Sequence, residues 1–326
     1  MKVLVTGANG FLANNVIREL NRRNIDVRAL VRSSANLHSL SGLKYEIFRG
    51  DFTLKESAMQ AVKGCNVIMH IAADTSQHYS NTVYNSDCNI NGTENLLNAA
   101  VNNQSDRFIY VSTANAFAHG TKEVPGDETS PARFPFTLSG YAVSKSKAQD
   151  LVIRYSLKYG LSSIIVNPAF MIGPFDFKPS SGKMVTMMYH RKVIPVPPGG
   201  KNFIHVCDVA YAICNSIDQG RPGECYLLAN ENLSYSEFYR KMEHVSGKKY
   251  YQVILNNGLM ATAGIFGKIV SYTGYKTDLN PFNARILCEG NYYTSAKAVR
   301  ELGLPQTPVD TAINDALEWF GRNGYL

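Results

Sequence analysis

The chain has 326 residues, 45% of them hydrophobic and 18% charged, which indicates a soluble globular protein and excludes a disordered or fibrous one. Its 33 Lys and Arg against 26 Asp and Glu give a net charge of +7. The basic residues are scattered, with no run longer than pairs such as Arg22-Arg23, so we expect a mildly cationic surface and no nucleic-acid partner. The six cysteines form no C-x-x-C pair and no metal-like cluster with the seven histidines, which predicts free thiols, no bound metal and a reducing, cytoplasmic location.

The sequence predicts neither a signal peptide nor a membrane-spanning segment. The first strand begins at residue 2, so no signal peptide is expected. The longest apolar stretch, Val253 to Val270, is interrupted by Asn256, Asn257 and Lys268, which predicts no membrane span. Two interpretations of this stretch stay open, a helix packed on the protein and a helix lying on a membrane surface.

Strand and helix patterns alternate through the first half of the chain. We expect strands at 2–6, 27–32, 45–49, 66–71, 107–112 and 162–167, and helices near 12–24, 55–63, 91–102 and 142–159. This alternation predicts parallel strands joined by crossover helices, an α/β doubly wound sheet. Beyond Pro168, prolines and the pair Gly199-Gly200 separate shorter elements. We therefore expect a first domain over 1–168, rejoined by a return segment at about 203–219, and a smaller substrate-binding lobe over 169–326.

The turn after the first strand has the pattern of a phosphate site. Gly7, Gly10 and Ala13 form G-x-x-G-x-x-A between an apolar strand and an amphipathic helix. Gly7 permits a tight turn, Gly10 lets a diphosphate approach the backbone, and a small residue at 13 lets helix and strand touch. We expect a dinucleotide to contact this turn, including Asn9, Phe11 and Leu12. The pattern alone is weak, because two glycines after a strand also form ordinary turns.

The end of the second strand bears on the choice of dinucleotide. NAD-binding chains usually carry an acid there, whereas the 2′-phosphate of NADP needs a cation. This chain has Arg32 followed by Ser33, which favours NADP(H), with NAD(H) still possible. The alternative is a surface arginine just past a strand. The remaining candidate contacts are Asp51 and Phe52 beside the adenine and Ala72 and Ala73 beside the ribose and diphosphate.

Tyr141 and Lys145 form the second informative pattern. A tyrosine at its usual pKa of about 10 exchanges protons poorly at neutral pH. A lysine one helical turn away would favour the phenolate and could hold the nicotinamide ribose. Y-x-x-x-K also occurs at Tyr272/Lys276 and Tyr293/Lys297, but only Tyr141 opens a helix after a strand that ends in Ser112-Thr113. Thr113 is expected to orient the substrate oxygen, with Ser112 as the alternative and strand capping as a structural explanation for Thr113.

These elements resemble the extended short-chain dehydrogenase/reductase family along nearly the whole chain. The motifs that carry the resemblance are Thr6 to Leu12, His70 to Ala73, Asn89 to Leu97, Val111 to Thr113, Tyr141 to Lys145, Asn167 to Ala169 and Phe203 to Ala210. The resemblance implies a Rossmann sheet that binds NAD(P), contacted also by Val111, and a catalytic triad of Thr113, Tyr141 and Lys145. It further implies that Asn89 holds a proton-relay water, although Asn89 could simply cap a helix. Pro168 and Ala169 would back the nicotinamide ring.

Two branches of this family compete. Nucleotide-sugar epimerases and dehydratases commonly have Arg-Asp where this chain has Lys201-Asn202. Many members of the family have Tyr-Gly where it has Phe117-Ala118, a departure that disfavours sugar recognition. The segment from Asn291 to Gly303, with Glu318 to the end, is similar to dihydroflavonol-4-reductase-like proteins and hopanoid-associated sugar epimerase homologues. The first hypothesis is an NADP(H)-dependent carbonyl reductase or alcohol dehydrogenase, and the alternative is a nucleotide-sugar epimerase or dehydratase.

A third hypothesis is a non-catalytic protein that senses the cofactor. The intact triad of Thr113, Tyr141 and Lys145 argues against this hypothesis. We expect the substrate to be a small molecule. No sequence pattern indicates which one. The candidate substrate-facing residues are Thr75 to His78, Ala114, Asn115, Phe170, Met171 and Tyr189. By the same resemblance we expect a homodimer formed through the helices that hold 92–101 and 142–159.

Overall fold

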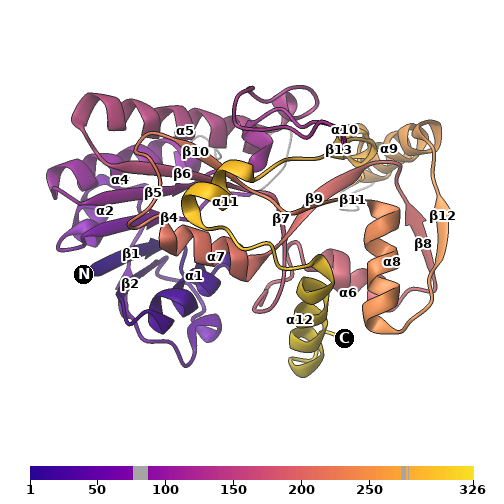
Figure 1. Ribbon diagram of the computed structural model, residues 1–326, viewed down its shortest axis with the longest axis horizontal. Helices are drawn as coiled ribbons and strands as arrows, with labels where there is room; N and C mark the ends of the chain where they lie inside the picture. Colours follow the sequence, from indigo (N-terminus) through magenta and orange to yellow (C-terminus); the bar gives the residue numbers. More distant parts are fainter. Residues whose placement is uncertain (76–86, 273–276, 278) are drawn as a thin grey trace.

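A seven-stranded parallel sheet forms the centre of the first half of the molecule (Figure 1). The computed structural model describes residues 1–75, 87–272, 277 and 279–326. The strand order is β10-β6-β5-β4-β1-β2-β3, and every neighbouring pair is parallel. The strands are β1 (Lys2–Thr6), β2 (Asp26–Val31), β3 (Glu46–Arg49), β4 (Val67–His70), β5 (Arg107–Val111), β6 (Ser163–Pro168) and β10 (Cys225–Leu228).

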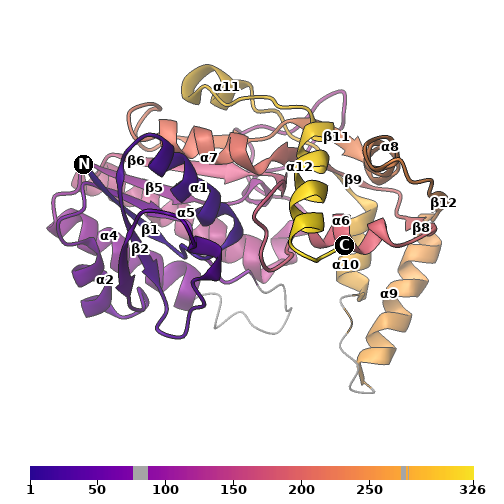
Figure 2. The same ribbon diagram turned by 90° about the horizontal axis from the view of Figure 1, so that it is seen from below.

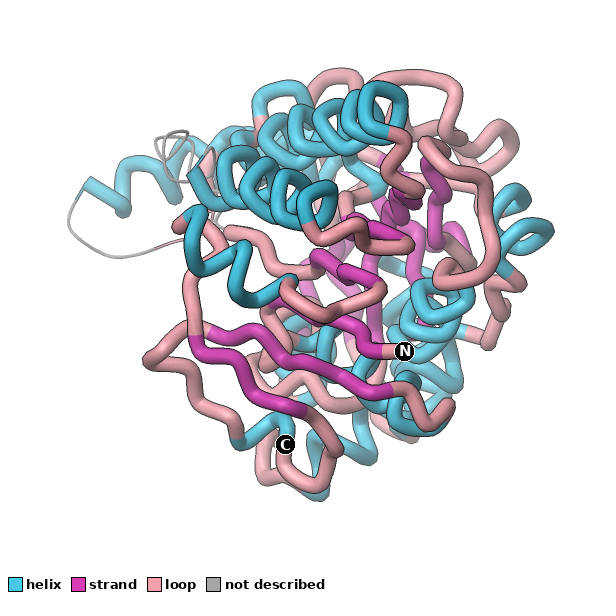
Figure 3. The backbone as a smooth tube through the Cα atoms, turned by 90° about the vertical axis from the view of Figure 1, so that its left-hand side faces the viewer, coloured by secondary structure: helices cyan, strands magenta, loops and turns pink. Residues whose placement is uncertain are grey.

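Helices cover both faces of this sheet, as the view onto its end shows (Figure 3). Side chains alternate along a strand, so Val3 and Val5 of β1 pack on one face and Leu4 on the other. The face of Val3 is covered by α1 (Phe11–Arg22), α7 (Val206–Asn215) and α11 (Ala296–Leu302). The face of Leu4 is covered by α2 (Lys55–Val62), α4 (Gly92–Asn102) and α5 (Gly140–Tyr159). Two apolar layers therefore bury the sheet completely, as parallel sheets require.

The rest of the chain forms a smaller lobe at one end of the molecule, on the right in Figures 1 and 2. A small sheet has β9 (Gly200–His205) at its centre, paired with β7 (Phe170–Ile172), β11 (Glu231–Ser234) and β13 (Gly290–Asn291). A separate ribbon pairs β8 (Val193–Val196) with β12 (Tyr251–Ile254). The helices are α6 (Lys183–Tyr189), α8 (Tyr235–Ser246), α9 (Asn257–Tyr272), α10 (Pro281–Cys288) and α12 (Val309–Arg322). Aromatic side chains dominate the core of this lobe, with Phe203 stacked on Phe238 at 4.3 Å between ring centres.

The α/β doubly wound class predicted from the sequence is confirmed. Every strand and helix expected in the first half is present, with ends displaced by no more than two residues. The return segment expected at about 203–219 contains both a lobe strand and a helix of the large domain. Residues 200–205 form β9 in the lobe, whereas α7 packs on α1 and β10 adds the edge strand next to β6. The division into two domains stays a prediction. All six cysteines lie within the described residues and are free thiols.

Candidate active site

Four parallel strands bring the candidate residues to one edge of the large sheet. Gly7 follows β1, Ala72 follows β4, Thr113 follows β5, and Pro168 ends β6. Parallel strands present their carboxyl ends at the same edge, so segments far apart in the sequence become neighbours there. The start of α5, which carries Tyr141, contacts the turn at 114–116 on the same edge.

The turn after β1 has the geometry that a diphosphate needs. Gly7 has a φ of +63°, and a Cβ there would meet Cα and Cβ of Ala72 at 3.0 Å. The Gly10 amide donates to the Gly7 carbonyl at 2.8 Å, which closes the turn directly before α1. The amides of Leu12 and Ala13 have no protein acceptor among the described residues, and no side chain caps α1. The glycine cradle and the free amides fit a dinucleotide phosphate.

The residues predicted to contact the adenosine half lie beyond β2 and β3. Arg32 is exposed, and no acid pairs with its guanidinium within the described part of the chain. The Ser33 carbonyl accepts a hydrogen bond from Nη1 of Arg49 at 2.7 Å, so a second guanidinium lies beside it. Oδ1 of Asp51 accepts hydrogen bonds from the amide and the hydroxyl of Thr53, so this carboxylate oxygen stabilises its own turn. Phe52 is buried with its ring against His70.

Tyr141, Thr113 and Lys145 come together at the start of α5. Ser139 accepts a hydrogen bond from the Ala142 amide at 3.2 Å and so caps this helix just before Tyr141. The side chain of Thr113 lies close enough to the Tyr141 hydroxyl to lower the pKa of the phenol, and the tyrosine is half-buried. Lys145 is 1% exposed, with Nζ 4.1 Å from the centre of the Tyr110 ring. Among the described residues the buried Ser112 hydroxyl has no hydrogen-bond partner, whereas Thr113 acts on the phenol, which favours Thr113 as the candidate hydroxyl.

Burial, rather than the lysine charge, dominates the protonation of this pair. We expected Lys145 to lower the pKa of Tyr141, but desolvation raises that pKa to about 12, against a smaller lowering by the hydrogen bond from Thr113. Desolvation also lowers the pKa of Lys145 to about 7, partly opposed by the nearby Cys88 thiol. In this state the tyrosine is a neutral phenol at neutral pH, the form that donates a proton.

Asn89 connects the segment before α4 to the start of α5. It lies in a π-helical turn, Asp87–Asn91, and is 1% exposed. Its amide nitrogen donates to the Asp74 carbonyl and to the Ser144 hydroxyl, both at 3.0 Å, and its oxygen accepts from the Asp74 amide at 2.8 Å. The Ser144 hydroxyl in turn donates to the Tyr141 carbonyl at 2.9 Å. Asn89 thus orients the backbone of the tyrosine, and its side chain caps no helix amide of α4.

A hydrogen-bonded chain through His70, to which the sequence analysis assigned no role, joins the phosphate turn to Asn89. The Thr6 hydroxyl accepts from the amides of Ile71 and Ala72, both at 3.0 Å, and bonds to Nδ1 of His70 at 2.9 Å. Nε2 of His70 lies 3.0 Å from the Thr93 hydroxyl, which donates to the Asn89 carbonyl at 2.7 Å. Burial lowers the pKa of His70 well below its usual value, so the ring is neutral. The sequence does contain a sign of this network, because Thr6 and His70 are polar residues at the ends of otherwise apolar strands.

A second buried network positions Thr113. Asn167 of β6 donates to the Thr113 carbonyl at 3.0 Å and to Oε1 of Gln149 in α5 at 2.8 Å. All three residues are buried. The strand that carries Thr113, its neighbour β6 and the tyrosine-bearing helix are therefore held to one another. Asn167 lies in one of the motifs that resemble the family, but that motif does not predict this contact.

The other two Y-x-x-x-K pairs have different surroundings. Tyr272 is 77% exposed on α9, and Lys276 lies outside the described residues. Tyr293 is buried, but Lys297 is paired with Glu224 at 2.7 Å and with the Cys225 carbonyl at 2.8 Å. Among the described lysines of these pairs, only Lys145 is buried without a carboxylate partner.

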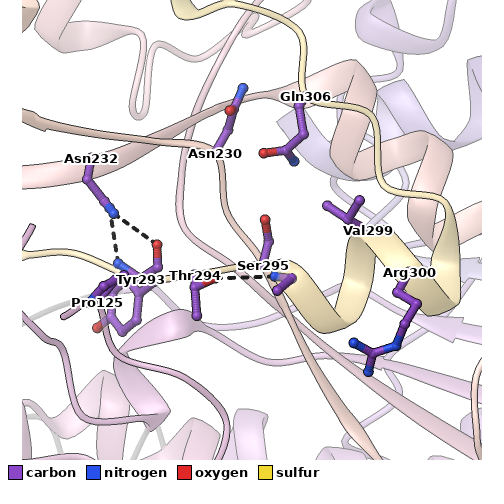
Figure 4. A pocket seen from close by; sticks show the side chains of 10 residues that line it. Pro125, Asn230, Asn232, Tyr293, Thr294, Ser295, Val299, Arg300 and Gln306 are labelled. Carbon is purple, nitrogen blue, oxygen red and sulfur yellow. Dashed lines mark hydrogen bonds between the residues drawn. The ribbon is translucent and has the colours of Figure 1, made fainter. Parts of the chain in front are cut away.

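Tyr293 lines a pocket of about 480 Å³ between β11 and the start of α11 (Figure 4). Asn232 bonds to both the amide and the carbonyl of Tyr293, at 3.0 and 3.1 Å. The Gln306 amide donates to the Ala229 carbonyl at 3.1 Å, and the Asn230 amide to the Thr307 carbonyl at 2.7 Å. These amides connect segments of the chain to one another, and none of the predicted site residues lines the pocket.

The remaining candidates have simpler contacts, and one of them, Tyr189, packs in the smaller lobe. Val111 is buried in the core, and Ala73 is half-buried after β4. The Ala169 amide donates to the Leu228 carbonyl at 2.9 Å, and Asn9 donates to the Asn36 carbonyl at 3.2 Å. Tyr189 ends α6 under the Lys248 ammonium. Of the predicted substrate-facing residues, Ser76 to His78 lie outside the described residues.

Comparisons with known proteins agree with this geometry. The model of the NAD dependent epimerase/dehydratase family matches residues 3–229. The chain belongs to this family.

Relatives and a solved structure cover the full chain. The chain is 29% identical to a putative dihydroflavonol 4-reductase from Synechocystis, over 99% of this chain and 95% of that protein. It is 28% identical to sterol demethylase protein B from Methylococcus capsulatus, over the whole of both chains. The crystal structure of gox2253 superposes with a TM-score of 0.86 at 29% identity and covers 99% of each chain. The resemblance drawn from the sequence is confirmed, and the protein is an NAD(P)-dependent oxidoreductase of the extended short-chain dehydrogenase/reductase type.

The unpaired Lys145 predicts a pH-dependent stability difference. The pKa of Lys145 is near 7 in the folded protein and 10.5 in the unfolded chain. Between pH 7 and 10.5 the unfolded chain therefore binds one proton more than the folded protein, and unfolding takes up that proton. Wild-type stability therefore rises with pH across this window. We expect Lys145→Met without cofactor to be more stable than wild type at pH 7 by on the order of 3 kcal/mol, a gap that closes towards pH 10. Chemical denaturation of both proteins across this range measures it, and a gap independent of pH would contradict the lowered pKa.

Proposed function

We propose that the protein is an NADP(H)-dependent oxidoreductase that reduces a carbonyl group or oxidises the corresponding alcohol. The observation that carries the proposal is the meeting of the Tyr141 phenol with Thr113, above a buried lysine that has no acid partner among the described residues. The relative named as a dihydroflavonol 4-reductase supports a reductase. When bound, the nicotinamide supplies or accepts the hydride.

The residues of the chain divide the remaining work. Thr113 and Tyr141 bind the carbonyl oxygen of the substrate, and the neutral phenol donates the proton that this oxygen needs as the alcohol forms. Lys145 binds the ribose hydroxyls and brings positive charge that stabilises the phenolate left behind. Asn89, through Ser144, fixes the backbone of Tyr141, and we propose that it also holds a water that returns the proton.

The dinucleotide would lie along the sheet edge. Gly7, Gly10, Phe11 and Leu12 would hold the diphosphate at the start of α1, where the amides are free. Pro168 and Ala169 would back the nicotinamide. The exposed guanidinium of Arg32, with Ser33 and the nearby Arg49, supports a 2′-phosphate contact and therefore NADP(H).

Replacing Tyr141 by Phe tests the proton transfer. We expect turnover to fall by about 10²- to 10⁴-fold with cofactor affinity kept, because only the reacting hydroxyl is lost. Tyr293→Phe is the matched control, since it removes a buried hydroxyl without a partner from the same Y-x-x-x-K spacing. Steady-state kinetics and cofactor titration of both variants measure the effect. Full activity in Tyr141→Phe would reject the mechanism.

Replacing Arg32 by Asp tests the cofactor preference. The lost charge-assisted hydrogen bonds and the new repulsion should raise the KM for NADPH by about 10- to 100-fold. The reaction of the same variant with NADH is the internal control, because NADH has no 2′-phosphate and should be used as well as before or better. An unchanged NADPH to NADH ratio would show that Arg32 does not read the phosphate.

One observation favours nucleotide-sugar epimerisation or dehydration as a second candidate. Lys201 of β9 lies over the ring of Phe170 with Nζ 4.9 Å from its centre, and burial lowers its pKa to about 8 without an acid among the causes. Such a cation beside a predicted substrate-facing residue suits an anionic group, for example a diphosphate.

Melting temperatures separate this second candidate from the first. If it holds, UDP- or dTDP-sugars will raise the melting temperature by several degrees, because a ligand that binds only the folded state stabilises it, by about 2.7 kcal/mol at 100 times its Kd. Lys201→Met should abolish the shift. If neither sugar nucleotide changes the melting temperature of the wild type, this candidate is rejected.

A further inference from the structure

Helix α9 presents its apolar side chains to solvent. Its outward stripe consists of Leu259, Ile265, Phe266, Ile269 and Tyr272, all more than half exposed, with Phe266 at 67%. At about 100° per residue these five positions fall within an arc of about 140°, so they lie on one face of the helix. Surface helices of globular proteins normally turn such a face inwards.

The packing of α9 fixes this orientation. Its inner face carries Met260, Gly264 and Gly267, which are buried. A Cβ on Gly264 would meet Cβ of Ala284 in α10 at 2.9 Å, and one on Gly267 would overlap the Leu279 carbonyl. The backbone of α9 thus lies directly against the segment that begins α10. The glycine face is committed to this contact, and the apolar face is left outside.

The β8–β12 ribbon continues the apolar surface at the same end of the lobe (Figures 1 and 2). Tyr251 is paired with Val193 and Val253 with Pro195, and all four side chains are exposed. Ile254, the last residue of β12, is 62% exposed only three residues before α9 begins. We call the following set the tip surface: Val193, Tyr251, Val253, Ile254, Leu259, Ile265, Phe266, Ile269 and Tyr272. A patch of this kind marks an interaction site.

The chain segments that carry the tip surface contain basic residues and no acidic ones. No Asp or Glu occurs from residue 177 to 207 or from residue 244 to 277, the segments that contain the ribbon and α9. The exposed cations that lie within or directly before β8, β12 and α9 are Arg191, Lys192, Lys249 and Lys268. Apolar and aromatic side chains bordered by lysine and arginine match the acyl and headgroup layers of an anionic membrane. A symmetric contact between two copies would bring like charges together, which disfavours self-association here.

We propose that the tip surface binds the surface of an anionic lipid bilayer. Phe266, Ile269 and their neighbours enter the boundary between headgroups and acyl chains, and the four cations contact anionic headgroups. The helix lies on the membrane and does not cross it, since among the described residues no helix is long and apolar enough to span a bilayer. The proposal does not depend on the reaction catalysed at Tyr141.

Co-sedimentation with vesicles tests the proposal. We expect wild type to bind phosphatidylcholine vesicles with about 30% phosphatidylglycerol, to bind pure phosphatidylcholine more weakly, and to lose binding as salt rises from about 0.1 to 0.5 M. The double variant Phe266→Asn/Ile269→Asn should partition at least about tenfold less, because two apolar anchors are removed. Leu54→Asn, at a position 61% exposed on the large-sheet side, is the matched control and should bind as wild type does.

Any of three results would overturn the proposal. One is wild type that fails to sediment with anionic vesicles, and another is a double variant that binds as well as wild type while its circular dichroism spectrum is unchanged. The third is a smaller oligomeric mass for the double variant in light scattering without vesicles, which would assign the tip surface to contacts between copies. A further variant, Lys249→Glu/Lys268→Glu, should weaken binding to the anionic vesicles and remove much of its salt dependence.

Discussion

The neutral, fully buried His70 is the contact on which the geometry of the site depends. Its two ring nitrogens join Thr6, beside the phosphate turn, to Thr93, which holds the Asn89 carbonyl. Because β1 and β4 are neighbours in the sheet, one imidazole spans the distance between the end of one strand and the helix that follows the other. Thr93 donates its proton to Asn89, so Nε2 of the ring donates to Thr93 and Nδ1 accepts from Thr6. A protonated ring could not accept from Thr6, so burial, which lowers the pKa, also preserves the network.

Burial governs the chemistry of the same site. Lys145 is a large, fully buried side chain whose ammonium lies over the Tyr110 ring, and no described carboxylate pairs with it. A fold selected for stability alone would pair such a cation or replace it. Keeping an unpaired lysine beside a phenol with a raised pKa is costly without ligand, and it leaves a cation ready for ribose hydroxyls and for charge that develops on the tyrosine.

The two ends of the molecule follow different packing rules. The large sheet is covered by apolar helices on both faces, whereas the lobe leaves the tip surface uncovered and surrounds it with cations. If the tip surface holds the protein against a membrane, Tyr141 works near that membrane, and substrates dissolved in lipid become accessible to it. The small-residue face of α9 makes this arrangement possible, because close backbone packing on α10 leaves no alternative side for the helix to bury.

Local patterns in the sequence determined the alternating elements of the first half, the glycine turn and the Y-x-x-x-K pair, because each depends on a few neighbouring residues and on the period of apolar positions. The order of the strands, the late edge strand β10 and the contacts of His70 and Asn167 could not be predicted, since they join residues distant in the sequence. The pKa of Tyr141 also depended on tertiary structure: the spacing to Lys145 suggested a lowered value, but desolvation by the surrounding chain raises it.

For the stretch from Val253 to Val270 the sequence allowed two interpretations. Only the packing of Gly264 and Gly267 decided which face of α9 is buried and which is left to solvent.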